Sequence, residues 1–354
     1  MTQALLAFLL LAASPDAPSL PQPSGKYPVG TIEMWSGSES ILVWYPASKA
    51  GKPAEYASAE TVHKLSDSSY YGQSADTIGS WAKVQNHASS DAQTRLGRWP
   101  LIVFLPGQGV VAFQYSAIAE ELASHGYIVA VVDYFSPDAP ARTYKEDDAD
   151  AAADDMARIA LAAVKTMKSQ PRWAQAMRFD QIAAAGHSIG GAAALALPRL
   201  DESFRASVDM DGAPFGESVK GVVAPALVLR SKPIYSDADL EKRGRTRDQW
   251  RKMGEEAAKV WNDLTSKSNG VVLRILSVRG TGHFSFSDAP FVMPDAISRF
   301  GGQPIAAERG QKIITECLLE FLDGYVRQES GAQAGKRCSS FQEIMTQEAV
   351  REEK

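Results

Sequence analysis

The stretch "IAAAGHSIGGAAALAL", residues 182–197, places one serine between two glycines. An apolar run leads into Gly186, Ser188 and Gly190, and a run of alanine and leucine follows. The apolar run predicts a buried strand, and the small residues predict a helix that packs closely against it. A sharp turn between the two strains the serine backbone and lifts its hydroxyl clear of the sheet, with glycines where a side chain would clash. The pattern therefore predicts a nucleophile at Ser188.

The same strand–turn–helix pattern also occurs in nucleotide-binding loops. Such a loop carries G-x-G-x-x-G or a phosphate-binding lysine, and the stretch has neither. We therefore prefer the nucleophile interpretation.

The rest of the chain alternates strand-like and helix-like segments around this turn. Continuous apolar runs indicate strands buried on both faces, and amphipathic spacing indicates helices. This alternation predicts one α/β domain with a mostly parallel central sheet and helices on both faces. We expect strands within 31–35, 40–47, 99–105, 126–134, 179–188, 204–211, 224–230 and 271–280, and helices within 115–124, 147–168, 190–200, 247–264 and 306–327.

A serine nucleophile needs a general base, and His283 is the best placed of the five histidines. It lies in "RGTGHFSF", residues 279–286, just past the last predicted strand, where a loop can return the imidazole to the serine. His187 lies inside the turn motif, and we expect its side chain to pack beside the turn.

The imidazole in turn needs an acid, and three aspartates between the serine and the base compete for that role. Asp211 ends a predicted strand directly before a glycine, so its side chain would project from the strand tip. Asp237 lies well beyond the end of the next strand, and Asp209 lies two residues before Asp211, deeper in the sheet. We rank Asp211 first, Asp237 second and Asp209 third.

Acyl transfer also needs backbone N–H donors for the oxyanion. One belongs to Ile189, the residue after the nucleophile. The other is expected in "FLPGQG", residues 104–109, where Gln108 is the predicted donor. We expect no cofactor and no metal, because no group of His, Asp and Glu has ligand spacing.

These segments resemble the platelet-activating factor acetylhydrolase family of α/β-hydrolases, whose bacterial members include serine esterases and to which polyester hydrolases are related. The resemblance covers about residues 28–328. It rests on "VFLPGQG" (103–109), "AGHSIGGAAAL" (185–195), "FRASVDMDGAPFG" (204–216) and "RGTGHFSF" (279–286).

The resemblance implies an α/β-hydrolase fold and assigns the same roles to the same residues. The triad it implies is Ser188, Asp211 and His283, and the oxyanion donors are Gln108 and Ile189. The chain departs from the family at 106–107, where Pro-Gly replaces the usual His-Gly. The donated group is a backbone N–H, so we expect activity to survive this change.

Both ends of the chain lie outside the predicted catalytic domain at 31–328. The apolar run at 5–13 is too short to span a bilayer and predicts a signal peptide over 1–17, although no basic residue precedes it. Residues 18–30 are expected to form a linker, and 329–354 a C-terminal tail. The two cysteines, Cys317 and Cys338, could pair if the protein is exported.

The long polar segment 56–97 has no clear pattern, and loops of this length commonly cover a site. We expect part of it, together with the helix at 247–264, to border the acyl pocket. Trp81 and Trp250 are the predicted pocket residues, and packing of the helix tryptophans into the core is the alternative.

Together these features predict a secreted or periplasmic serine hydrolase that acts on short-chain acyl esters or phospholipid esters. A polyester hydrolase, an amidase and a peptidase remain alternatives, as does a non-catalytic binding protein of the same fold. The net charge of −5 and the lack of a basic cluster interleaved with aromatic residues argue against a nucleic-acid partner. No segment is apolar and long enough to be transmembrane.

Overall fold

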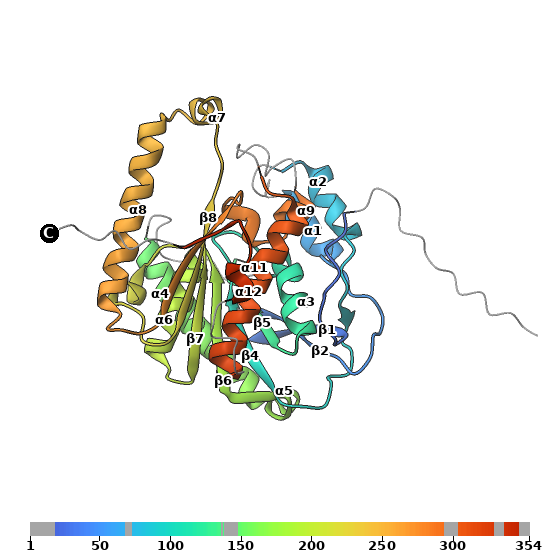
Figure 1. Cartoon of the computed structure of the whole chain (residues 1–354). Coiled ribbons are helices and arrows are strands. Elements are labelled where there is room, and N and C mark those ends of the chain that lie inside the picture. The colour runs from blue at the N-terminus through green and yellow to red at the C-terminus, as the bar shows by residue number, and fades with distance from the viewer. Residues whose placement is uncertain are drawn as a thin grey trace, which may run out of the picture.

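A single sheet runs through the computed structural model, which describes residues 18–67, 73–135, 137, 148–293, 304–328 and 336–346 (Figure 1). Its ten strands are β1 (Val29–Ser36), β2 (Glu39–Pro46), β3 (Ser89–Ser90), β4 (Trp99–Leu105), β5 (Ile128–Val132), β6 (Met177–His187), β7 (Phe204–Met210), β8 (Ala226–Lys232), β9 (Leu273–Arg279) and β10 (Ile344–Thr346).

The strands lie in the order β10-β9-β8-β7-β6-β4-β5-β2-β1-β3. The six strands from β5 to β9 in this order are parallel, because helical crossovers connect them. Antiparallel pairing occurs toward both edges, where β2 pairs with β1 and β5, and where β10 pairs with β9. Parallel strands bring their carboxyl ends to one edge of the sheet, and the loops there hold the predicted site residues.

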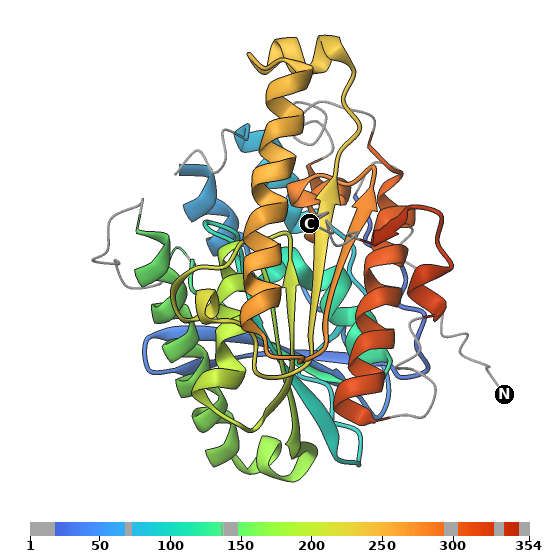
Figure 2. The ribbon, with the colours of Figure 1, turned by 60° about the vertical axis from the view of Figure 1, so that its left-hand side comes forward.

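Helices cover both faces of the sheet, because successive side chains of the apolar strands point to opposite sides. Leu101 and Val103 face a core formed with one set of helices, whereas Ile102 and Phe104 face a core formed with the other. Figure 2 shows α4 and α6 on one side of the sheet and α11 on the other, so the predicted fold class is confirmed. The first set is α4 (Ala149–Ser169), α5 (Pro171–Ala176) and α6 (Ile189–Leu200), and the second is α3 (Ser116–Ser124) and α11 (Ala307–Leu322).

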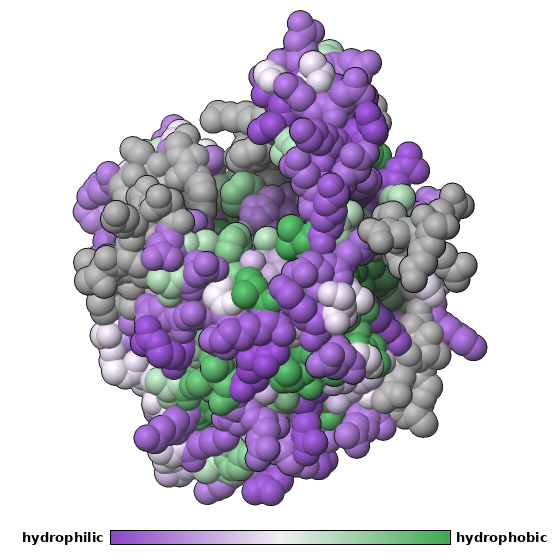
Figure 3. Space-filling model, turned by 90° about the vertical axis from the view of Figure 1, so that its left-hand side faces the viewer, coloured by the Kyte–Doolittle hydropathy of each residue, from purple (hydrophilic) through white to green (hydrophobic). Residues whose placement is uncertain are grey.

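Two helices form an arm that extends beyond the sheet, defined here as residues 237–267 (Figure 1). They are α7 (Asp237–Lys242) and α8 (Arg247–Lys267). Trp261 and Leu264, near the end of α8, are buried against β8 and α6. The first half of α8 carries exposed Met253 and half-buried Trp250, so the apolar stripe predicted for this helix reaches the core only at its carboxyl end. The surface of the projecting end is mostly hydrophilic (Figure 3).

The described parts of the segment 56–97 include short helices beside the edge of the sheet where the site residues gather. These are α1 (Ala59–Asp67), α2 (Ala75–Ser80) and the 3-10 turn η2 (Trp81–Lys83). Tyr56, Trp81 and Phe113 form a small apolar cluster with α9 (Ala289–Val292), in which the Trp81 side chain is fully buried.

The last described segment, 336–346, returns to the sheet. Cys338, in α12 (Lys336–Ser339), forms a disulfide with Cys317 of α11. Strand β10 then adds to the edge of the sheet beside β9. The predicted signal peptide, 1–17, lies outside the described residues. Among the helices that the structure describes, none combines the length and apolar character needed to cross a membrane.

Candidate active site

Ser188 occupies a strained turn between β6 and α6. Its φ of 55° and ψ of −126° lie in a region that L-residues rarely adopt. The backbone holds this conformation: the Ser188 N–H donates to the carbonyl oxygen of Met210 on β7 at 2.9 Å. A side chain at Gly186 would collide with the backbone of Gly190, and one at Gly190 would collide with that of Leu105. The two glycines are therefore required by the tight turn.

His283 lies between Ser188 and Asp211, within hydrogen-bond distance of both. Its Nε2 is 3.0 Å from the Ser188 hydroxyl, and its Nδ1 is 2.8 Å from Asp211 Oδ2. A carboxylate oxygen can only accept, so Nδ1 carries the proton and Nε2 is left to accept from the serine hydroxyl. The serine hydroxyl, the imidazole and the carboxylate therefore form one hydrogen-bonded line, the geometry that a nucleophile, a base and an orienting acid require.

Asp211 follows the end of β7, and backbone groups fix its position. Its N–H donates to the carbonyl oxygen of Leu229 at 2.7 Å, and its Oδ1 accepts from the N–H of Ser231 at 2.6 Å. With the first oxygen occupied in this way, the second is aimed at His283.

The other two candidate acids lie elsewhere. Asp237 is exposed at the start of α7, where it pairs with Arg247 at 2.7 Å. Asp209 is fully buried, and its Oδ1 accepts from the N–H of Gly212 at 2.7 Å. Burial raises the pKa of Asp209 to about 8. Of the three aspartates, Asp211 is the one that contacts His283.

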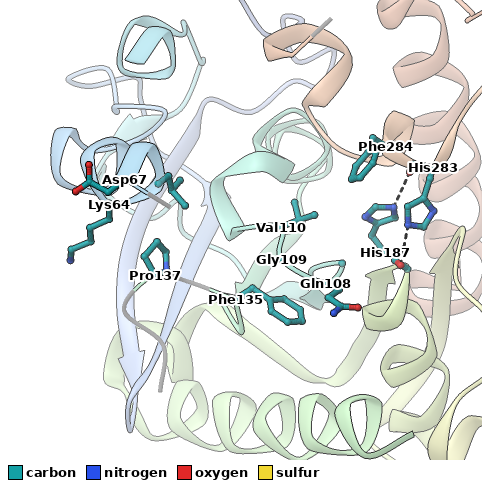
Figure 4. Close-up of a pocket in the computed structure, with 13 residues that line it drawn as sticks. Lys64, Asp67, Gln108, Gly109, Val110, Phe135, Pro137, His187, His283 and Phe284 are labelled. Carbon is teal, nitrogen blue, oxygen red and sulfur yellow. Dashed lines mark hydrogen bonds between the residues drawn. The ribbon is translucent and has the colours of Figure 1, made fainter. Parts of the chain in front are cut away.

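A cavity of about 1100 Å³ opens beside Ser188 and His283. The loop after β4 lines it through Gly107, Gln108, Gly109 and Val110 (Figure 4). Ile189 begins α6, a position whose N–H has no partner within the helix. The two predicted oxyanion donors, Gln108 and Ile189, therefore come from segments that adjoin the serine.

The two predicted pocket tryptophans do not line this cavity. Trp81 is fully buried, and its Nε1 donates to the carbonyl oxygen of Val292 at 3.4 Å. Trp250 lines a different cavity beneath the arm. The segment 56–97 still reaches the cavity beside the serine, through Lys64, Leu65 and Asp67 of α1. Figure 4 shows α1 at the opposite end of this cavity from His283 and Phe284.

Sequence reasoning missed a polar network behind the serine. His187 is fully buried: its Nδ1 is 2.9 Å from the hydroxyl oxygen of Tyr115, and its Nε2 is 2.9 Å from the carbonyl oxygen of His283. The Tyr115 oxygen also accepts from the N–H of Gly107 at 2.8 Å. The sequence signal was a polar side chain within a buried motif, which needs a partner, but Tyr115 could not be identified as that partner from its position in the chain.

Within the described ranges, no group of three or more His, Cys, Asp or Glu side chains is arranged to hold a metal ion. What the site brings together is a serine hydroxyl, an imidazole nitrogen at hydrogen-bond distance from it and a carboxylate that accepts from the same imidazole.

Comparison with known proteins places these features in a family. The sequence model of the family described as "Platelet-activating factor acetylhydrolase, isoform II" matches residues 12–179 and 172–343. The platelet-activating factor acetylhydrolase of Cavia porcellus is 25% identical, with 90% of this chain and 80% of that protein covered. The protein of the same name from Canis lupus familiaris is 23% identical, with 80% and 71% covered.

A solved structure also resembles the chain over most of its length. It is described as a ferulic acid esterase from Streptomyces cinnamoneus, with a TM-score of 0.72 and 24% sequence identity. The match covers 94% of this chain and all of that chain. The likeness shows that the two share a fold.

Proposed function

The chain belongs to the platelet-activating factor acetylhydrolase family and is a carboxylic ester hydrolase, and from this premise we propose that it works through a Ser188–His283–Asp211 triad and an acyl-enzyme. The observation that carries the proposal is the hydrogen-bonded line from Ser188 Oγ through His283 to Asp211.

In the first half-reaction, the Ser188 oxygen attacks the ester carbonyl carbon while its proton moves to His283 Nε2. The carbonyl oxygen becomes an oxyanion, which the N–H groups of Gln108 and Ile189 stabilise. The C–O bond to the alcohol then breaks, and His283 returns the proton to the leaving oxygen. Asp211 keeps the imidazole oriented and stabilises its positive charge.

In the second half-reaction, a water molecule takes the place of the alcohol. His283 removes a proton from the water, the hydroxide oxygen attacks the acyl carbon, and the bond to Ser188 breaks with return of the proton to the serine oxygen. The products are the free acid and the regenerated enzyme.

For the substrate, we propose esters with short acyl groups, including acetyl and other short acyl esters of phospholipids. The names of the two acetylhydrolase relatives support this class. Polyester hydrolysis and amide or peptide hydrolysis use the same kind of site. A panel of nitrophenyl esters of increasing acyl length, run beside an anilide and a lysophospholipid analogue, separates ester hydrolysis from amide hydrolysis and measures the preferred acyl length. The proposal expects fastest turnover of the shortest esters and little cleavage of the anilide.

The nucleophile is tested by Ser188→Ala. The variant should fold normally, lose ester turnover and lose labelling by a fluorophosphonate probe. Ser169→Ala, which removes an exposed hydroxyl at the end of α4, is the matched control and should behave as wild type. Labelling that persists in Ser188→Ala would assign the nucleophile to another residue, and absence of turnover in the wild type would favour the non-catalytic alternative.

We also propose that the protein is exported to the periplasm or secreted. The apolar run at 5–13 supports export. The Cys317–Cys338 disulfide adds support, since disulfides persist in oxidising compartments and are rare in the cytosol.

A further inference from the structure

A second cavity lies on the arm side of His283, which lines both cavities. Its volume is about 930 Å³, and we call it the arm cavity. Three walls enclose it: the end of β8 with residues 230–235, the arm with Arg243 and Trp250, and the loop 280–285 that carries His283. Asp211 also lines it, so a molecule in the arm cavity lies next to His283 and Asp211, whereas Ser188 lines the first cavity.

The arm cavity carries an excess of positive charge. Five basic side chains and two acidic ones line it. Both acids are already paired: Asp211 accepts from His283, and Glu255 pairs with Arg251 at 3.0 Å. The remaining cations form no ion pair with any residue that the structure describes; they are Arg230, Lys232, Arg243 and Arg245.

Arg230 is close enough to Asp211 and Asp209 for their carboxyl groups to act on it electrostatically. It lies on β8, beside β7, which Asp211 follows, and its side chain is half-buried without a hydrogen bond to any described residue. Burial lowers the pKa of its guanidinium, although Asp211 and Asp209 act in the opposite direction and raise it. A partly desolvated cation without a bonded partner is unfavourable, so an anion that reaches it gains a charge-assisted hydrogen bond.

Arg243 provides a second donor without an acceptor. Its guanidinium lies over the ring of Tyr235, 4.5 Å from the ring centre, and its Nη2 is buried with no hydrogen-bond partner. Tyr235 in turn packs edge-on against Trp250 at 5.0 Å between ring centres. The arm cavity therefore combines an aromatic wall with guanidinium groups whose hydrogen-bonding capacity is unused.

The chemistry of the triad indicates which half of an ester lies in the arm cavity. The leaving oxygen takes its proton from His283 Nε2, so it must lie within hydrogen-bond distance of that atom. The loop after β4, which holds an oxyanion donor, lines the first cavity and not the arm cavity. The alcohol half thus extends past His283, toward the arm.

We propose that the arm cavity binds an anionic group, a carboxylate or a phosphate, on the alcohol half of the ester, with Arg230 as its principal partner. This inference rests on the proposed function for the assignment of the two halves of the substrate. The catalytic machinery itself does not depend on it.

The test uses three acetate esters that differ only in the alcohol. They are 4-acetoxybenzoate, 4-acetoxyphenyl phosphate and the neutral 4-acetoxybenzamide. Wild-type kcat/KM for at least one anionic ester should exceed that for the neutral ester, and comparison of the two anionic esters shows which anion the cavity prefers. Because turnover of the neutral ester reports on the triad alone, its loss would mark a failure of the proposed function.

Arg230→Gln should reduce the anionic-to-neutral ratio of kcat/KM by about tenfold, as expected for the loss of one charge-assisted hydrogen bond. Arg230→Lys, which keeps the charge, should reduce it less. Arg205→Gln removes an equal charge at the opposite end of the sheet, on β7, and should leave the ratio unchanged. A ratio that Arg230→Gln does not change, or that Arg205→Gln lowers equally, would overturn the proposal.

A binding measurement makes the test independent of turnover. Calorimetric titration of the Ser188→Ala protein with 4-hydroxybenzoate and 4-hydroxybenzamide compares the charged and neutral alcohols directly. The charged alcohol should bind more tightly, and adding Arg230→Gln should abolish the difference. Equal affinity for the two alcohols in the Ser188→Ala protein would contradict the proposal.

Discussion

His187 donates a hydrogen bond from Nε2 to the carbonyl oxygen of His283 at 2.9 Å, and so joins the serine turn to the loop that carries His283. Burial lowers the pKa of His187 to about 3, which keeps the imidazole neutral. With Nε2 protonated, Nδ1 accepts from the hydroxyl of Tyr115, whose oxygen accepts from the N–H of Gly107. One chain of hydrogen bonds therefore links the loop after β4, the serine turn and the loop that carries His283.

Tyr115→Phe should weaken catalysis more than substrate binding. The change leaves the Gly107 N–H and His187 Nδ1 without their partner, so two loops of the site lose a fixed position. We expect kcat to fall about tenfold with little change in KM, because a misplacement of reacting groups by a fraction of an ångström is costly. Steady-state kinetics on a neutral acetate ester measures both constants.

Tyr127→Phe is the matched control for this change. Tyr127 is also buried, and its hydroxyl donates to Asp323 at 2.7 Å, away from the site. Both variants should lose about 1–3 kcal/mol of unfolding free energy, but Tyr127→Phe should keep wild-type kcat. Equal kcat in the two variants would show that the Tyr115 network stabilises the fold without positioning the site.

Asp211→Asn should lower kcat by about 10⁴, as in comparable triads, because an amide no longer fixes the productive tautomer of His283. Asp237→Asn should change kcat little, since Asp237 is exposed and pairs with Arg247. Single-turnover measurements on the two purified variants separate these outcomes. The reverse result would assign the orienting acid to the loop after β8.

The parallel part of the fold could be predicted because its strands are apolar on both faces. The runs at 101–105 and 128–132 contain no polar side chain that would need to face solvent, so they belong in the centre of a sheet covered on both faces. The order of Ser188, Asp211 and His283 along the chain then follows from which strands end at the same edge. In the structure, the His283 side chain lies within hydrogen-bond distance of both Ser188 and Asp211.

The surroundings of the site could not be predicted, because they depend on contacts between distant segments. An aromatic residue in a polar segment suggests a pocket, but Trp81 packs into a cluster with Phe113 and Val292, far along the chain. The arm has an apolar stripe, yet only Trp261 and Leu264 reach the core, because the helix is longer than the sheet edge that it covers.

Removal of the disulfide should destabilise the protein. The Cys317–Cys338 bond closes a loop with a sequence separation of 21. Closing a loop of this size lowers the entropy of the unfolded chain and so stabilises the folded protein by about 3 kcal/mol. Cys317→Ser with Cys338→Ser should lower the unfolding free energy by that amount, and a reducing agent should lower Tm in the wild type only.

Protein from the native host should show a mass two hydrogens below the reduced form and a mature start between Ser14 and Ser19. An intact Met1 with two free thiols would contradict export.

The buried carboxyl of Glu120 should make stability depend on pH. Burial raises its pKa from an ordinary value of 4.5 to about 8, although hydrogen bonds from the N–H groups of His87 and Ala88 lower it in part. Between these values the folded protein holds a proton that the unfolded chain has lost, so stability falls as pH rises from about 4.5 to 8. Burial also raises the pKa of Asp288 to about 7, and its charge raises that of Glu120. Ionisation of Asp288 therefore also lowers the stability of the folded protein as pH rises.

Glu120→Gln isolates this contribution. Relative to wild type, the variant should gain on the order of 2–4 kcal/mol between pH 5 and pH 8, measured by urea unfolding at each pH. Glu121→Gln is the control: burial raises the pKa of Glu121, but hydrogen bonds from His125 and Ser24 outweigh it and lower the pKa, so Glu121 is ionised in both states across this window. Parallel pH profiles of wild type and Glu120→Gln would show that Glu120 is already ionised in the folded protein.

Trp81 and Trp250, the two tryptophans that the sequence predicts in the acyl pocket, should give opposite results. Trp81→Ala empties a fully buried position and should lower the unfolding free energy by about 3–5 kcal/mol, with no change in the ratio of kcat/KM between short and long acyl esters.

Trp250→Ala removes a half-buried wall of the arm cavity, so stability should change by less than about 1 kcal/mol. The ratio of kcat/KM between aryl and methyl alcohols of one acid should fall, because the aromatic wall that contacts an aryl alcohol is lost. Urea unfolding and the two substrate ratios, measured on both variants, decide the assignment: a stable Trp81→Ala with altered acyl-chain selectivity would return that residue to the substrate pocket.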